Sequence, residues 1–87
     1  MKVKGTSMIN ARILEGYFVL VRQQSIAEQG EIVVVLIDNK ATVKRFYKDK
    51  NKIKLQPENY TMEPIIVDPR ENNVTIVGKI EGVIRKV

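Results

Sequence analysis

Most of the chain alternates between apolar and polar residues with a period of two, which is typical of β-strands rather than helices. The continuous apolar, β-branched run at 31–37 predicts a strand that is buried on both faces. Shorter apolar or alternating segments lie on either side of it, separated by polar turn residues. These further strands are predicted at 17–22, 41–47, 52–55, 65–67 and 74–87. We therefore expect a small, mostly β domain of twisted antiparallel strands.

The connections between these segments predict the order of the strands. Polar turns at 38–40 and 48–51 join successive strands, so the region from 17 to 55 is predicted to form a β-meander. In the segment 74–87, glycines occur where a bulge or a close backbone approach is common. One face of this segment is predicted to carry Val74, Ile76, Gly78, Ile80, Gly82 and Ile84, and the other Val77, Val83 and Val87.

Helical signals are few, so we expect no more than one or two short turns. The segment 9–14 could form one turn after Ser7. The segment 25–30 has a capping-box pattern, with Ser25 three residues before Glu28, and Gly30 as a stop. It is too short for more than a single turn.

The length of 87 residues indicates one small domain, 1–87. The hydrophobic fraction of 44% is ordinary for a globular protein. A core of this size is limited, because small domains bury a smaller fraction of their surface. We therefore expect a folded domain that self-association supports.

The lack of histidine and cysteine excludes several kinds of chemistry. It rules out a disulfide framework, a thiolate metal site, and the Ser-His-Asp and Cys-His arrangements. The acidic residues show neither metal-loop spacing nor a paired arrangement, and we expect no metal and no cofactor. A nucleophile in this chain would need Lys, Asp or Glu as its base.

The net charge and the hydropathy exclude only a few classes of binding partner. The net charge of +5 permits weak attraction to nucleic acid but does not require it. The apolar stretch at 32–37 is too short to span a membrane, and the first residues lack a signal-peptide pattern. We therefore expect a cytoplasmic protein with no membrane partner.

Ser7, within the stretch Gly-Thr-Ser-Met, admits two interpretations. It could cap a short helix over 9–14. It could instead be a nucleophile beside the free N–H groups of a helix start, which stabilise an oxyanion. Both interpretations predict similar local geometry, so the pattern does not separate them. Neither the Gly-x-Ser-x-Gly nor the Ser-x-x-Lys motif is present around Ser7.

Lys44 differs from the other lysines between 44 and 54 because it lies inside a predicted strand. It shares a face with Thr42 and Phe46. The simple interpretation is an exposed strand lysine. The functional interpretation is a general base, which must be neutral, so its pKa must fall from about 10.4 towards 7 or 8. Burial would lower the pKa, because a low dielectric disfavours the ammonium form.

Both residues fall in motifs that resemble the C-terminal protease domain of LexA-type repressors. The resemblance extends from about Val3 to Arg85, and its motifs are GTSM, ILEGYFVLVR, GEIVVVLID, ATVKRFY, LQPEN, MEPIIVD and GKIEGVIR. In that family the serine of Gly-x-Ser-Met is the nucleophile and the lysine of Thr-Val-Lys is the base. The resemblance assigns these roles to Ser7 and Lys44. We expect backbone N–H groups of Ser7 and Met8 to hold the oxyanion.

The resemblance also implies the context of the reaction. It implies a fold of the LexA and signal-peptidase type, and self-cleavage of an Ala-Gly bond that RecA filaments stimulate in the SOS response. In the family, the scissile bond and a DNA-binding winged helix-turn-helix lie upstream of Ser-Met. We expect this chain to lack both, so that it cannot cut itself. We also expect DNA contact to belong only to the missing N-terminal domain. Thr6 stands where the family often has Asp, at a variable position.

The last predicted strand raises the question of a partner. It could be a partly exposed strand, or an edge that pairs with a second subunit. The family dimerises through its C-terminal region, so we expect a homodimer through 74–87.

Two other functions remain as alternatives. One is a polymerase-accessory (UmuD-like) or non-enzymatic dimerisation module of the same fold. The other is a small nucleic-acid-binding β-barrel. The second lacks a stacking platform, because the adjacent aromatics at 17–18 and 46–47 point to opposite faces of their strands.

Overall fold

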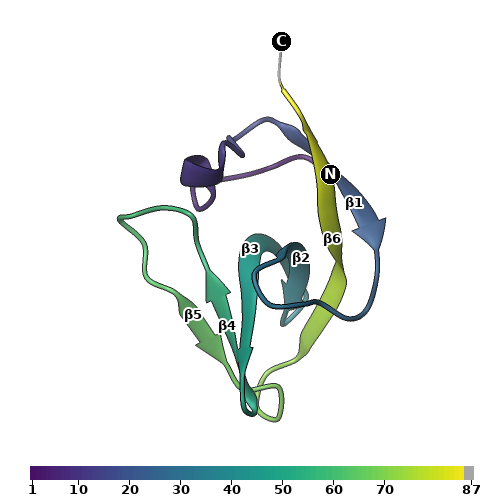
Figure 1. Ribbon diagram of the computed structural model, residues 1–87, viewed down its shortest axis with the longest axis vertical. Coiled ribbons are helices and arrows are strands. Elements are labelled where there is room, and N and C mark those ends of the chain that lie inside the picture. Colours follow the sequence, from purple (N-terminus) through teal and green to yellow (C-terminus); the bar gives the residue numbers. More distant parts are fainter. Residues whose placement is uncertain (86–87) are drawn as a thin grey trace.

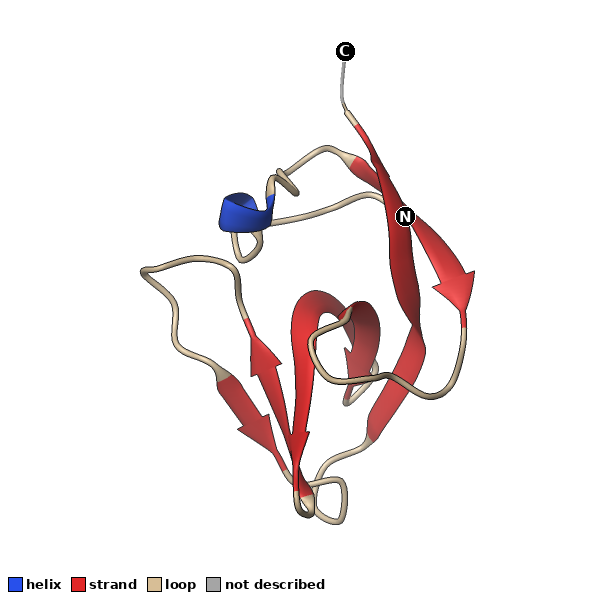
Figure 2. Ribbon diagram, viewed as in Figure 1, coloured by secondary structure: helices blue, strands red, loops and turns tan. Residues whose placement is uncertain are grey.

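The computed structural model describes residues 1–85, which form one curved antiparallel sheet (Figure 1, Figure 2). A single short 3₁₀ helix, η1 (Ile9–Ala11), lies ahead of the sheet within these residues. The strands are β1 (Phe18–Gln23), β2 (Ile32–Ile37), β3 (Lys40–Asp49), β4 (Lys52–Gln56), β5 (Ile65–Val67) and β6 (Val74–Ile84). The expected mostly β fold is confirmed. The end of the strand predicted at 74–87, including Val87, lies outside the described residues.

The strand order is β1-β6-β2-β3-β4-β5, so the predicted meander holds only from β2 to β5. β1 does not pair with β2. Instead, β6 lies between them and pairs with both (Figure 1). Val33, Val34 and Val35 of β2 are buried, as its apolar run predicts, because a core cluster packs on each face of this strand.

β6 contains two bulges, which makes the predicted assignment of its faces wrong. Val34 pairs with Gly78 and Val35 with Ile76, so Val77 has no partner in β2. Each extra residue reverses the alternation of side chains beyond it. Ile76 therefore packs into one core cluster and Ile80 into the other. The second bulge is at Glu81, and Ile84 beyond it is 51% exposed.

The core is divided into two clusters, one on each face of β2. Val34 belongs to the first, and Val33 and Val35 belong to the second. The first cluster also holds Val3, Met8, Ile13, Val19 and Val43, so it attaches the N-terminal segment to the sheet. The second also holds Phe46, Ile53, Leu55 and Val67 from β3, β4 and β5.

Gly78 is needed for the close approach of β1 to β6. A Cβ atom at this position would lie 2.4 Å from the carbonyl oxygen of Arg22. Any side chain would therefore push the two strands apart at the point where Gln23 pairs with Gly78.

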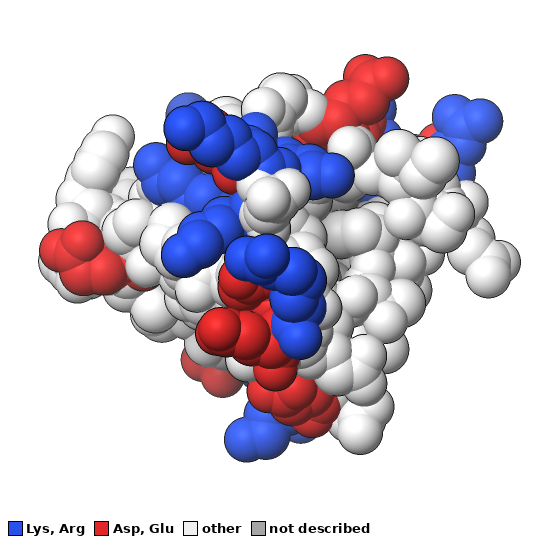
Figure 3. All heavy atoms as spheres, turned by 90° about the horizontal axis from the view of Figure 1, so that it is seen from below, with Lys and Arg blue, Asp and Glu red and all other residues white. Residues whose placement is uncertain are grey.

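Charged side chains of both signs share the surface. Figure 3 shows Lys and Arg side chains next to Asp and Glu side chains on the face seen from below. Lys48, Lys50 and Lys52 near the β3–β4 turn are exposed, and Asp49 lies among them. This face therefore mixes the two charges.

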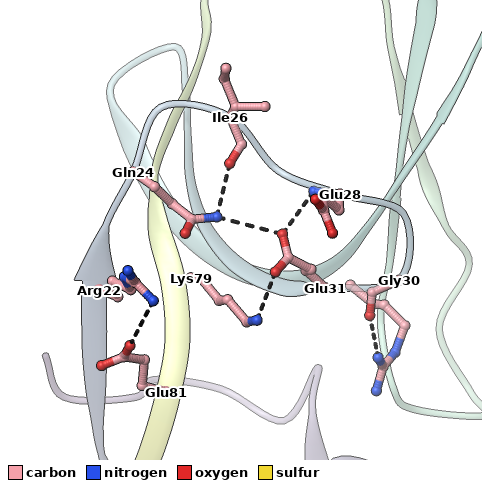
Figure 4. Close-up of polar contacts among 9 residues, drawn as sticks. Arg22, Gln24, Ile26, Glu28, Gly30, Glu31, Lys79 and Glu81 are labelled. Atoms are coloured by element: carbon pink, nitrogen blue, oxygen red, sulfur yellow. Dashed lines mark hydrogen bonds and ion pairs between the residues drawn. The ribbon is translucent and has the colours of Figure 1, made fainter.

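The helical turn predicted at 25–30 does not form. The carboxylate of Glu31 accepts hydrogen bonds from the Glu28 N–H (2.7 Å) and from the Gln24 amide (3.5 Å), and it forms an ion pair with Lys79 (2.8 Å; Figure 4). The N–H of Glu28 thus bonds to the carboxylate at 31 rather than closing a capping box with Ser25. These contacts fix the connection between β1 and β2.

Candidate active site

The loop that carries Ser7 is held against the start of β1 and against the core. The Val3 N–H donates to the Tyr17 carbonyl (2.8 Å), and the Gly16 N–H donates to the Val3 carbonyl (2.9 Å). Gly5 has a φ of +80°, a conformation that glycine adopts without strain. The buried side chain of Met8 anchors the end of this loop in the first core cluster.

Ser7 does not cap the short helix. The N-cap residue of η1 is Met8, and no side chain caps the helix. The helix is also confined to 9–11, which is shorter than the segment 9–14 considered for it. The helix-cap interpretation of Ser7 is therefore wrong.

Lys44 is buried in β3, with only 6% of its surface exposed, so its interpretation as an exposed strand lysine is also wrong. Its Nζ lies 2.8 Å from the Ser7 Oγ, 2.7 Å from the Thr42 Oγ1 and 3.2 Å from the Val43 carbonyl oxygen. The pairing between β3 and β4 ends where Arg45 faces Gln56. The part of β3 that holds Lys44 is therefore open on that side.

Burial lowers the pKa of Lys44 below the ordinary lysine value. Within residues 1–85, no carboxylate pairs with its Nζ to oppose this shift. A neutral amine has two N–H donors and one lone pair. If the neutral amine gives its two N–H groups to Thr42 and Val43, its lone pair faces the hydroxyl of Ser7, to which the ammonium form donates instead. The arrangement thus suits a base that takes a proton from Ser7.

A cleft of about 290 Å³ lies beside Ser7. Its walls come from the N-terminal segment and from β3, and they include Lys2, Met8, Ala41 and Val43. Within residues 1–85, the backbone N–H groups of Ser7 and Met8 have no hydrogen-bond acceptor. They are free to donate to a ligand atom in this region.

The sequence did not identify the loop at 57–60 as part of this site, although LQPEN contributed to the resemblance. The loop contacts the serine loop through several hydrogen bonds. The Asn10 N–H donates to the Glu58 carbonyl (2.7 Å), and the Asn59 amide donates to the Thr6 carbonyl (2.8 Å). Contacts between loops so far apart in sequence leave no periodic pattern that could have predicted them.

Two kinds of feature are not found in the described part of the chain. Residues 1–85 contain no group of three or more His, Cys, Asp or Glu side chains placed to hold a metal ion. No helix among them has the length and apolar character needed to cross a membrane.

Sequence comparisons identify the class of this domain. A profile of the Peptidase S24-like family matches residues 1–81, so the chain belongs to this family of peptidase-type domains. The expected resemblance to the C-terminal domain of LexA-type repressors is confirmed. The chain is 53% identical to LexA repressor 1 of Geobacter sulfurreducens over 98% of its own length. It is 58% identical to the LexA repressor of Desulfitobacterium hafniense, also over 98%, and 52% identical to that of Syntrophomonas wolfei over 100%. The chain spans only 42%, 40% and 41% of these three relatives, respectively.

Proposed function

We propose that residues 1–87 act as the serine peptidase and dimerisation domain of a LexA-like repressor, with Ser7 as nucleophile and Lys44 as general base. The observation that carries this proposal is the 2.8 Å contact between the Lys44 Nζ and the Ser7 Oγ. It occurs around a buried lysine without a carboxylate partner in residues 1–85, which is the environment that a neutral lysine base requires.

In the proposed reaction, the Ser7 Oγ attacks the carbonyl carbon of an Ala-Gly bond while its proton passes to the neutral Lys44 Nζ. The oxyanion that forms accepts hydrogen bonds from the free N–H groups of Ser7 and Met8. The Lys44 ammonium then gives its proton to the leaving amine, which breaks the C–N bond and leaves an acyl-serine. Water attacks this ester, and Lys44 again takes up a proton and returns one to Ser7.

The wider role belongs to a longer protein of the kind represented by the relatives. We assign to that protein DNA binding through a separate N-terminal domain, and self-cleavage stimulated by RecA filaments in the SOS response. The chain of 87 residues contains no Ala-Gly dipeptide. A peptide that carries this bond must therefore be supplied to test the chain by itself.

The homodimer is assigned to the end of the sheet formed by β1 and β6. Phe18 lies opposite Ile84 in the strand register, and both are exposed, as is Leu20 at 53%. The prediction that β6 is a free edge is wrong for its first half, because residues 74–79 pair with β2. Residues 80–84 pair only with β1, so their other side is open. A second subunit covering this region would bury both the open backbone and the apolar side chains.

The peptidase proposal is tested with a peptide that contains an Ala-Gly bond, incubated with the chain at alkaline pH. Wild type is expected to cleave it and Ser7→Ala is not. Ser25→Ala is the matched control, since Ser25 is exposed and is the other serine in the chain. Equal cleavage by wild type and Ser7→Ala would overturn the assignment, whereas a folded wild type that does not cut would favour the non-enzymatic module.

The nucleic-acid alternative makes a different prediction. A binding surface for a phosphate backbone would make the affinity for DNA fall steeply with salt. The mixed charges seen in Figure 3 do not favour such a surface on that face. Salt-sensitive DNA binding by the 87-residue chain alone would restore this alternative, and its absence at low salt would remove it.

A further inference from the structure

The side chain of Asn59 is buried, polar and fixed in orientation. It is 9% exposed, and its Oδ1 accepts hydrogen bonds from the Thr61 N–H (3.0 Å) and the Thr61 hydroxyl (2.7 Å). These two contacts identify the oxygen of the amide, so the Nδ2 is the group that faces the Thr6 carbonyl at 2.8 Å. Both the oxygen and the nitrogen of this buried amide have hydrogen-bond partners, so the side chain joins Thr61 to Thr6 in one fixed orientation.

The atom that Asn59 holds belongs to the same peptide unit as the N–H of Ser7. A trans peptide is planar, and its C=O and N–H point in opposite directions. No cis peptide occurs in the described residues. Asn59 is the closer of two donors to the Thr6 carbonyl, since the Ile9 N–H lies at 3.4 Å. A donor on this carbonyl also fixes the direction of the Ser7 N–H. That N–H is one of the two free donors beside the nucleophile.

The loop of Asn59 is itself fixed to both sides of the site. On the serine side, the Asn10 N–H donates to the Glu58 carbonyl, and the Tyr60 N–H donates to the Asn10 Oδ1 at 3.1 Å. On the lysine side, the Arg45 guanidinium forms an ion pair with the Glu58 carboxylate. Arg45 directly follows Lys44 in β3. Asn59 therefore extends from a loop whose position is tied to the strand of the base.

We propose that Asn59 is a positioning residue, which aims the Ser7 N–H at the oxyanion by holding the Thr6 carbonyl. This inference rests on the proposed peptidase function. It adds that turnover depends on an amide outside the Ser-Lys pair. Asn59 does not touch the reacting atoms, so its loss should affect the transition state through the peptide unit alone.

The test compares Asn59→Asp with wild type on the Ala-Gly peptide. The substitution keeps the size of the side chain and the acceptor for Thr61, but it removes the Nδ2 donor. We expect kcat to fall about tenfold to a hundredfold, since removal of a whole oxyanion donor costs about 10²–10³ in kcat. KM should change by less than about twofold, because the oxyanion is absent from the bound substrate.

The matched control is Asn10→Ala, which removes the hydrogen bond from the Tyr60 N–H to the Asn10 Oδ1. It keeps the backbone bond from the Asn10 N–H to the Glu58 carbonyl, so the two loops stay joined and Asn59 still holds the Thr6 carbonyl. It should retain wild-type kcat. A merely structural role for Asn59 predicts instead that both variants lose stability and activity in parallel. A kcat for Asn59→Asp within twofold of wild type, or an equal loss in Asn10→Ala, would overturn the inference.

A peptide boronate supplies a second measurement, because it forms a tetrahedral adduct on the serine. Asn59→Asp, or Asn59→Ala if the first variant does not fold, should bind the boronate at least tenfold more weakly while binding the uncleaved peptide as wild type does. Unchanged boronate affinity would contradict the inference. If wild type neither cleaves the peptide nor binds the boronate, the proposed function itself fails. If wild type is active and Asn59→Asp is equally active, only the inference about Asn59 fails.

Discussion

Lys44 and Lys79 lie on the two strands that flank β2, and each faces Val33 in its strand pair. Lys44 is buried, bonds only to hydroxyl and carbonyl oxygens, and has a pKa lowered by burial. Lys79 has a side chain that is 43% exposed, and its hydrogen bond to Glu31 raises its pKa. Equivalent positions in one sheet thus hold lysines whose pKa values shift in opposite directions.

The difference lies in what covers each side chain. The serine loop covers Lys44 with a hydroxyl group, which cannot neutralise an ammonium ion. The connection at 24–31 presents the Glu31 carboxylate to Lys79, and this carboxylate does neutralise the ammonium ion (Figure 4). Burial without a counter-charge is costly in a small domain and is characteristic of working sites. The contrast therefore separates a candidate base from a lysine that fixes the fold.

The largest expected effect is on cleavage. Lys44→Met should lower the rate on an Ala-Gly peptide by about 10²–10⁴-fold, because it removes the general base. Lys79→Met is the matched control and should stay within about twofold of wild type. Rates for the two variants are measured at one pH with the same peptide. Full activity in Lys44→Met would contradict the role of Lys44 as the general base.

The pH dependence of the cleavage rate reports the protonation state of Lys44. Below the pKa of Lys44 the rate should rise about tenfold per pH unit, as the amine loses its proton. Since burial lowers this pKa, the plateau should begin below the ordinary lysine value of about 10.4. Lys79→Met should give the same profile. A wild-type rate that is independent of pH, or that falls between pH 6 and 9, would be incompatible with a neutral lysine base.

The next effect is on stability, and it has the opposite sign to the effect on activity. Lys44→Met should raise the free energy of unfolding by about 1 kcal/mol near pH 6, because a charged group no longer has to be buried. The unfolded chain holds the Lys44 proton up to a higher pH than the folded chain, so wild type gains stability as the pH rises. The advantage of the variant should therefore shrink towards pH 10. Urea denaturation at both pH values measures it, and a variant that is less stable at pH 6 would contradict the expectation.

The smallest effect is expected from loss of the ion pair between Glu31 and Lys79. Glu31→Gln should slightly lower the melting temperature at pH 7 without changing cleavage. The hydrogen bond from Lys79 lowers the pKa of Glu31, so this stabilisation is present above the ordinary carboxyl pKa and is lost as the pH falls through the lowered value. High salt should also weaken it, because the pair is partly exposed. A loss of melting temperature that persists at pH 2 would indicate packing rather than charge.

The sequence predicts the strands well, because burial leaves a local pattern. Three signals are visible without the structure: the apolar run that becomes β2, the alternation that becomes β3 and β4, and the short apolar segment that becomes β5. The position of β6 is not, since no local signal says which two strands a segment will join. The bulges at Val77 and Glu81 also break the alternation on which its faces were assigned.

The site could be predicted only in part, for a related reason. Ser7 and Lys44 were assigned as nucleophile and base through a family resemblance. The residues alone did not decide whether Ser7 caps a helix or whether Lys44 is exposed. The burial of Lys44 depends on the serine loop covering the open part of β3. The contact between Asn59 and Thr6 joins residues 53 positions apart and leaves no periodic signal.

The position of β6 also bears on the kinetics of folding. Ser7 lies on the segment attached to β1, whereas Lys44 belongs to the meander of β2 to β5. In the strand order, these two blocks are joined only when β6 enters between β1 and β2. Such non-local pairing closes late and slowly during folding. A chain in which β6 has not yet paired thus lacks the strand contacts that join the block of Ser7 to the block of Lys44, and only the loop and core contacts remain to bring the two residues together.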